Sequence, residues 1–142
     1  MKWGFSDDGE PSGTAGKPIL AQLSGSGVGK FYRDALELEI KDQYVFDGFS
    51  LTYLANPETD FELELTHNHD QSEPYTHGNG YGHLAVSVED IAATHRRLTS
   101  LDIEASDIKV FDHQERHLAT FFFITDPDGY KIEFLQRQGR YL

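Results

Sequence analysis

Two glutamates and one histidine are the residues of this chain that could bind a metal ion together. Glu64, His83 and Glu133 each lie on the expected concave face of a strand-like, alternating segment. Carboxylate oxygens and imidazole nitrogens bind divalent ions at about 2.0–2.2 Å, and open coordination positions would allow Lewis-acid chemistry on substrate oxygens. The alternative is that each is an ordinary outward-facing polar residue. Spacing alone favours this alternative, because polar alternation is common in antiparallel sheets.

The elements that must position these residues occur in the same order twice. Each copy is a strand, a helix and three further strands, as judged from apolar periodicity. The segments of the first copy are 17–23, 28–38, 43–46, 49–55 and 60–67; those of the second are 81–89, 91–101, 107–111, 118–125 and 130–136. This repeat predicts an α+β fold in which two βαβββ modules form an incomplete barrel with a cleft.

Local signals support this order of elements. Asp47-Gly48 is typical of a tight hairpin, and "DPDG" at 126–129 is typical of a turn. Asp90 is suited to cap a helix whose apolar stripe runs to Leu101.

The predicted domain organisation has a tail and one domain. Residues 1–16, rich in Gly, Ser, Asp and Pro, are predicted to be a mobile tail. Residues 17–142 are predicted to form a single domain with modules at about 17–67 and 80–136.

Composition excludes several classes of function. The chain of 142 residues carries a formal charge of −12, which would repel nucleic acid. It has no cysteine, so thiolate catalysis and disulfides are excluded. No apolar run is long enough for a membrane span, and no signal-peptide pattern precedes the domain. We therefore expect a soluble, cytoplasmic protein with no nucleic-acid or membrane partner.

Three stretches together resemble one known family. "FELELTHN", "GNGYGHLAVSVED" and "FFFITDPDGYKIEFL" are similar to glyoxalase I (lactoylglutathione lyase) of the vicinal-oxygen-chelate superfamily, which also contains bleomycin-resistance proteins and dioxygenases. The similarity runs from about Phe31 to Leu135. It implies the paired-module fold and a homodimer with the metal site between chains.

The resemblance also implies roles for particular residues. Glu64, His83 and Glu133 would be metal ligands, Glu64 and Glu133 would be the catalytic carboxylates with Glu133 as the base, and Asn68 would contact glutathione. The metal would be Zn²⁺ or Ni²⁺, and glutathione or another thiol would be the co-substrate. The implied reaction converts a methylglyoxal–thiol hemithioacetal to a thioester by proton transfer through an enediolate.

The chain departs from the family pattern in its first strand. An ungapped alignment puts Lys17 at the position of the fourth ligand, and a shortened junction "SGSGVG" puts Gln22 there instead. Gln22 is thus a candidate ligand, although an outward polar residue explains it equally well. The same loop resembles a phosphate-binding loop only superficially, because Phe31 stands where a hydroxyl is required. Other histidines could replace the fourth ligand: His67, His69 or His117.

The arginines with which the family holds glutathione are also absent at the matched positions. Arg116 and Lys131 are possible substitutes. Loss of bidentate guanidinium contacts would weaken binding of an anionic tripeptide. The alternative function is a non-catalytic module that binds a drug or another small molecule. An iron-dependent dioxygenase ranks last, since it needs two histidines and one carboxylate.

Overall fold

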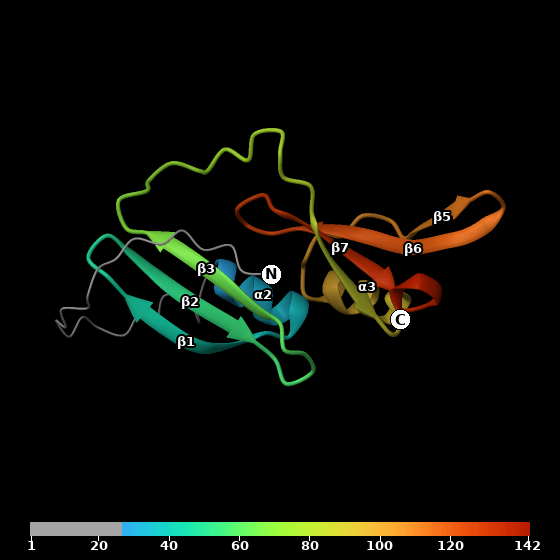
Figure 1. Ribbon diagram of the computed structural model, residues 1–142, viewed down its shortest axis with the longest axis horizontal. Helices are drawn as coiled ribbons and strands as arrows, with labels where there is room; N and C mark the ends of the chain where they lie inside the picture. The colour runs from blue at the N-terminus through green and yellow to red at the C-terminus, as the bar shows by residue number, and fades with distance from the viewer. Residues whose placement is uncertain (1–26) are drawn as a thin grey trace. The chain divides into compact units, whose positions relative to one another are not determined.

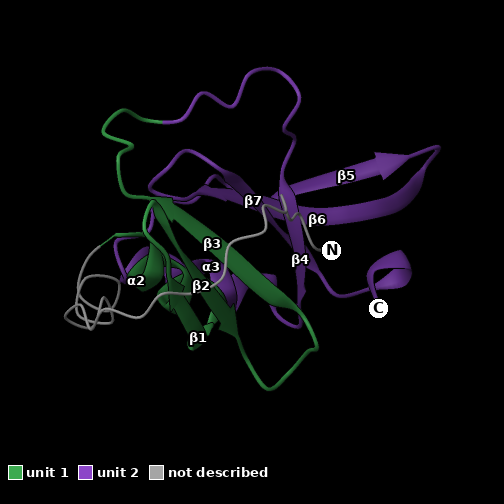
Figure 2. Ribbon diagram, turned by 60° about the vertical axis from the view of Figure 1, so that its left-hand side comes forward, with its two compact units in different colours: residues 1–74 green, residues 75–142 purple. Residues whose placement is uncertain are grey.

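The computed structural model describes residues 27–142, which divide between two compact units (Figure 2). Unit 1 ends at Pro74 and unit 2 runs from Tyr75 to Leu142. In each unit the described residues form one α-helix and one β-sheet (Figure 1). The predicted α+β class is therefore confirmed. The predicted tail 1–16 and strand 17–23 lie outside the described residues.

The described part of unit 1 is a helix followed by a three-stranded antiparallel sheet. Its elements are α2 (Val28–Leu36), β1 (Glu39–Val45), β2 (Phe49–Ala55) and β3 (Glu62–Asn68), with strand order β1-β2-β3. The hairpin predicted at Asp47-Gly48 joins β1 to β2, where the Phe46 N–H donates to the Phe49 carbonyl at 2.8 Å. The helix ends at Glu37, whose backbone is left-handed at φ 56°.

Burial in unit 1 alternates along the strands. Ser50, Thr52 and Leu54 in β2 are at most 2% exposed. The residues between them point to the other face, because successive side chains of a strand alternate. In β3, Leu63 is half-buried and Glu64 is exposed, as the alternating sequence predicts. Glu64 therefore lies on the more open face of this sheet.

Unit 2 contains the complete strand–helix–three-strand order predicted for the second copy. Its elements are β4 (Leu84–Val88), α3 (Ile91–Ser100), β5 (Lys109–His113), β6 (Arg116–Thr125) and β7 (Lys131–Gln136), followed by a 3-10 turn at Gly139–Tyr141. The strand order is β4-β7-β6-β5. The β4–β7 pair is parallel and the other two pairs are antiparallel. The first and last elements of this module therefore lie side by side.

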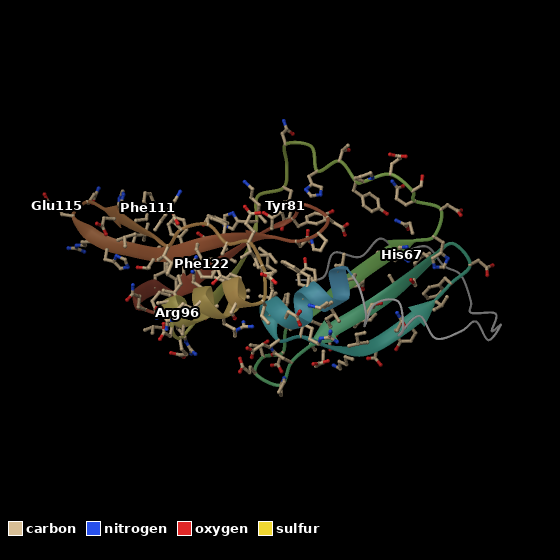
Figure 3. The ribbon with its side chains drawn as sticks, turned by 180° about the vertical axis from the view of Figure 1, so that it is seen from behind. His67, Tyr81, Arg96, Phe111, Glu115 and Phe122 are labelled. Carbon is tan, nitrogen blue, oxygen red and sulfur yellow. The ribbon has the colours of Figure 1, made fainter. Side chains whose placement is uncertain are left out.

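The core of unit 2 lies between α3 and the strands β6 and β7. The Phe122 and Phe134 rings stack with centroids 5.0 Å apart, and both are at most 1% exposed. Figure 3 shows Phe122 directed toward the helix. Leu98 of α3 is fully buried, and Asp90 caps the helix by accepting from the Ala93 N–H at 2.8 Å. Leu101, predicted to continue the apolar stripe, is 44% exposed because the helix ends there.

The second copy departs from the predicted boundaries at β4. The strand begins at Leu84 rather than at 81, so His83 lies immediately before it. Within residues 27–142, no helix is both long and apolar enough to cross a membrane.

Candidate metal centre

His83 and Glu133 come together in unit 2. The distance from His83 Nε2 to Glu133 Oε2 is 3.1 Å, with the side chains 41% and 15% exposed. The parallel pairing of β4 with β7 explains this contact. It aligns Ala85 with Glu133, and His83 lies two residues before Ala85 on the same side of the sheet. This is the face opposite Ile132 and Phe134, which are buried against α3.

An aromatic ring completes the surroundings of this pair. Phe123 of β6 is aligned with Glu133, and its ring lies edge-on to His83 with centroids 5.3 Å apart. Phe123 was not predicted as a site residue. The alternation of β6 places it on this face, but only the register of β6 against β7 puts it beside Glu133. The ring shields one side of the imidazole from water.

The two donor atoms are separated as neighbouring ligands of one ion would be. Two atoms that each lie about 2.1 Å from a divalent ion, at roughly a right angle, are about 3 Å apart. The 3.1 Å between His83 and Glu133 matches this separation. An imidazole nitrogen and a carboxylate oxygen are also the donor types that Zn²⁺ and Ni²⁺ accept. The pair therefore supplies two donors of suitable type, and its 3.1 Å separation is also that of an imidazole–carboxylate hydrogen bond.

Glu64 belongs to unit 1 and has a defined partner there. Tyr53 of β2 is aligned with Glu64 of β3 across the sheet. A hydrogen bond to the Glu64 carboxylate, together with partial burial, raises the pKa of Tyr53 to about 12. The phenol thus donates to Glu64 and orients its carboxylate. The alternation of β2 places Tyr53 on this face, but its pairing with Glu64 depends on a register that the sequence does not specify.

Tyr53 should be the tyrosine that loses its proton at the highest pH. We expect this last titration step to be absent from the Tyr53→Phe variant. The raised pKa means that the folded protein holds this proton more tightly than the unfolded chain does. The resulting stabilisation is complete below pH 10 and is lost as the pH rises toward 12. Tyrosinate absorbance followed against pH measures this titration. The matched control is Tyr44→Phe, because Tyr44 is the exposed neighbouring ring, 6.1 Å from Tyr53. The assignment is wrong if the last titration step survives Tyr53→Phe.

The remaining predicted site residues are Asn68 and Gln22. Asn68 is the last residue of β3 and shares a face with Glu64. Gln22 lies outside the described residues. Among residues 27–142, no group of three or more histidine, cysteine or acidic side chains is gathered closely enough to hold a metal. The structure thus pairs His83 with Glu133 and places Glu64 in the other unit.

The alternative histidine ligands have other partners. His117 Nδ1 lies 3.3 Å from Asp112 Oδ1, and His117 Nε2 lies 2.6 Å from Gln138 Nε2. His67 and His69 are near each other at the end of β3, with ring centroids 5.6 Å apart. Neither arrangement involves His83 or Glu133.

Comparison with known proteins establishes the family. The sequence model of the Glyoxalase/Bleomycin resistance protein/Dioxygenase superfamily matches residues 29–134. A crystal structure of a glyoxalase I mutant from Zea mays has the same fold, with a TM-score of 0.66 and 24% identity over 79% of this chain. The chain spans 40% of that maize protein. The protein therefore belongs to the Glyoxalase/Bleomycin resistance protein/Dioxygenase superfamily.

Within this superfamily the chain is similar to lactoylglutathione lyases. The lactoylglutathione lyase of Neisseria meningitidis serogroup A is 35% identical over 113 residues, which cover 77% of this chain and 80% of the relative. The predicted resemblance to glyoxalase I is confirmed.

A separate match concerns a short stretch of the chain. Twenty-seven residues are 85% identical to part of the IMPACT family member YigZ of Escherichia coli K12, which is 19% of this chain and 13% of YigZ. The glyoxalase family model leaves residues 1–28 and 135–142 uncovered. Gln22 is in that uncovered part. Its role as a family ligand stays a prediction.

Proposed function

We propose that the protein is a metal-dependent lyase of the glyoxalase I type, which isomerises a methylglyoxal–thiol hemithioacetal to a thioester. The observation that carries the proposal is the His83–Glu133 pair, 3.1 Å apart on the sheet face away from α3. Membership of the superfamily and 35% identity to a lactoylglutathione lyase support it.

The metal would be held by Glu64, His83 and Glu133, with Gln22 as the proposed fourth donor. Zn²⁺ or Ni²⁺ would supply Lewis acidity toward the two neighbouring substrate oxygens. Glu64 lies in unit 1, and the other two lie in unit 2. We also propose a homodimer, which sedimentation of the purified protein would test.

Glu133 is the proposed base. Its carboxylate is mostly shielded, 15% exposed, so water competes weakly for it. It would remove the C–H proton next to the substrate carbonyl and return it to the neighbouring carbon. His83 on one side and Phe123 across the strand limit the positions that this carboxylate can take. Glu64, fixed by the Tyr53 phenol, would act as the second carboxylate of the site.

The contacts to the thiol co-substrate are proposed from strand position. Asn68 shares a face of β3 with Glu64, and Lys131 shares a face of β7 with Glu133. Lys131 is therefore a better substitute for the missing arginines than Arg116, which is at the far end of β6. A single ammonium group binds a carboxylate without bidentate pairing. We propose glutathione or another thiol as co-substrate.

Metal depletion and reloading test the proposed function. We expect the chelator-treated protein to be inactive with methylglyoxal and glutathione, and Zn²⁺ or Ni²⁺ to restore thioester formation, because the Lewis acid would be absent without the ion. Thioester absorbance is the measurement, repeated with smaller thiols in place of glutathione. The matched control is His113→Ala, which removes an exposed imidazole of β5 and should respond as wild type does. Absence of turnover with either ion and every thiol would reject the proposal.

The second candidate is a non-catalytic module that binds a small apolar molecule. The observation in its favour is the aromatic surface on β5 and β6, where Phe111 is 56% exposed and the rings of Phe121 and Phe123 lie 5.7 Å apart. Metal analysis of the purified protein separates the two candidates. A stoichiometric divalent ion would favour the lyase, and a metal-free protein that binds aromatic ligands would favour the second candidate.

A further inference from the structure

A cluster of three rings lies where the chain enters β4 and β7, next to His83 and ahead of Glu133 in the sequence. The His77 and Tyr130 rings stack with centroids 4.0 Å apart and an interplanar angle of 19°. The Tyr81 ring stands edge-on to both, 6.1 Å from His77 and 5.1 Å from Tyr130. We call His77, Tyr81 and Tyr130 the three-ring cluster.

One side of the cluster is fixed by the turn before β7. The Asp126 carboxylate, itself buried, accepts from the backbone N–H groups of Asp128 and Tyr130 at 3.0 and 2.8 Å. The backbone of Asp126 and Tyr130 is also hydrogen-bonded at 2.9 Å. Tyr130 is therefore a rigid platform, and it precedes Glu133 by three residues.

The other side of the cluster holds the segment that leads into β4. Tyr81 precedes His83 by two residues, and its hydroxyl donates to the Lys131 carbonyl of β7 at 3.3 Å. Tyr81, labelled in Figure 3, lies outside regular secondary structure, as does His83. The regular β4–β7 pairing begins only at Leu84 opposite Ile132. The ladder therefore does not reach His83. Tyr81, two residues before His83, is anchored by the cluster and by its hydrogen bond to Lys131.

His77 contributes to the cluster by packing. Its Nε2 atom is buried and has no hydrogen-bond partner among the described residues. Gly129 leaves room for the ring, since a Cβ at this position would lie 3.3 Å from His77 Cε1. The contribution of His77 that the structure describes is the stack on Tyr130, which an apolar ring of similar shape could replace.

We propose that His77 is a positioning residue, which acts through the three-ring cluster to hold His83 against Glu133. The proposal deepens the proposed function, because it names what sets the spacing of two of the ligands. Residues that orient metal ligands typically change metal affinity by about 10–100-fold when they are replaced. We expect loss of His77 to change the 3.1 Å distance between His83 Nε2 and Glu133 Oε2.

The test uses the full chain and two measurements. The first is the imidazole NMR signal of His83 without metal, at a fixed alkaline pH, and the second is calorimetric titration with Zn²⁺ alone. We expect His77→Ala to move the His83 signal and to weaken Zn²⁺ binding about 10–100-fold. We expect His77→Phe to restore both, since it retains the stack. His113→Ala, which removes an exposed imidazole of β5, should change neither.

A milder variant covers the case in which His77→Ala does not fold. Tyr81→Phe removes only the hydroxyl that donates to Lys131, and we expect a smaller movement of the His83 signal. The proposal is overturned if the His83 signal stays in place in the variants that fold, or if His77→Phe behaves as His77→Ala does. Absence of Zn²⁺ binding by the wild type would reject the proposed function. The NMR signal of His83 recorded without metal would still show whether His77 positions His83.

Discussion

The Glu133→Gln variant is expected to lose lyase activity by about 10²–10⁴-fold, the range that a general base contributes. The amide keeps the size of the side chain but cannot accept the substrate proton. Steady-state thioester formation with the metal-loaded protein gives the measurement. The loss should fall on kcat, because the base acts in the proton-transfer step.

The fold should survive this change. Glu133 is partly exposed and points away from Phe122 and Phe134, so an unfolding curve close to that of wild type is expected. Glu89→Gln is the matched control, because Glu89 is an exposed acid just after β4, ion-paired with Arg137 at 2.7 Å and separate from His83. Activity within about twofold of wild type in Glu133→Gln would show that another group removes the proton.

The Phe122→Ala variant is expected to lower the free energy of unfolding by about 3–5 kcal/mol. Phe122 is fully buried and stacks on Phe134, and the His95 ring meets it edge-on at 5.0 Å. Removal of the ring loses the free energy gained by transferring it from water into the core, and it leaves a cavity between α3 and the sheet. Denaturant unfolding monitored by circular dichroism measures the change.

Phe111→Ala provides the comparison for that variant. Phe111 is the same residue type in the same unit, but it is 56% exposed on the edge strand β5 (Figure 3). We expect a change within about 0.5 kcal/mol, as for most surface substitutions. Equal destabilisation by the two substitutions would contradict the assignment of Phe122 to the core.

Within the described residues, local signals in the sequence predicted the order of the elements. Asp47-Gly48, the "DPDG" turn and the Asp90 cap all act within a few residues, and each is confirmed in the structure. Strict alternation placed Glu64 on the open face of β3. Residue types also determined the candidate donors, since few side chains other than carboxylates and imidazoles suit a divalent ion in a chain without cysteine.

Strand register was decided only by the tertiary structure. Glu133 meets His83 and Phe123 because β7 pairs with β4 on one side and β6 on the other, at particular offsets. Tyr53 meets Glu64 for the same reason. The start of β4 at Leu84 and the exposure of Leu101 likewise depend on where the ladder and the helix end. The alternation of side chains along a strand lets the sequence specify which face each side chain occupies. Which residues become its neighbours on the adjacent strands depends on the packing of the whole sheet.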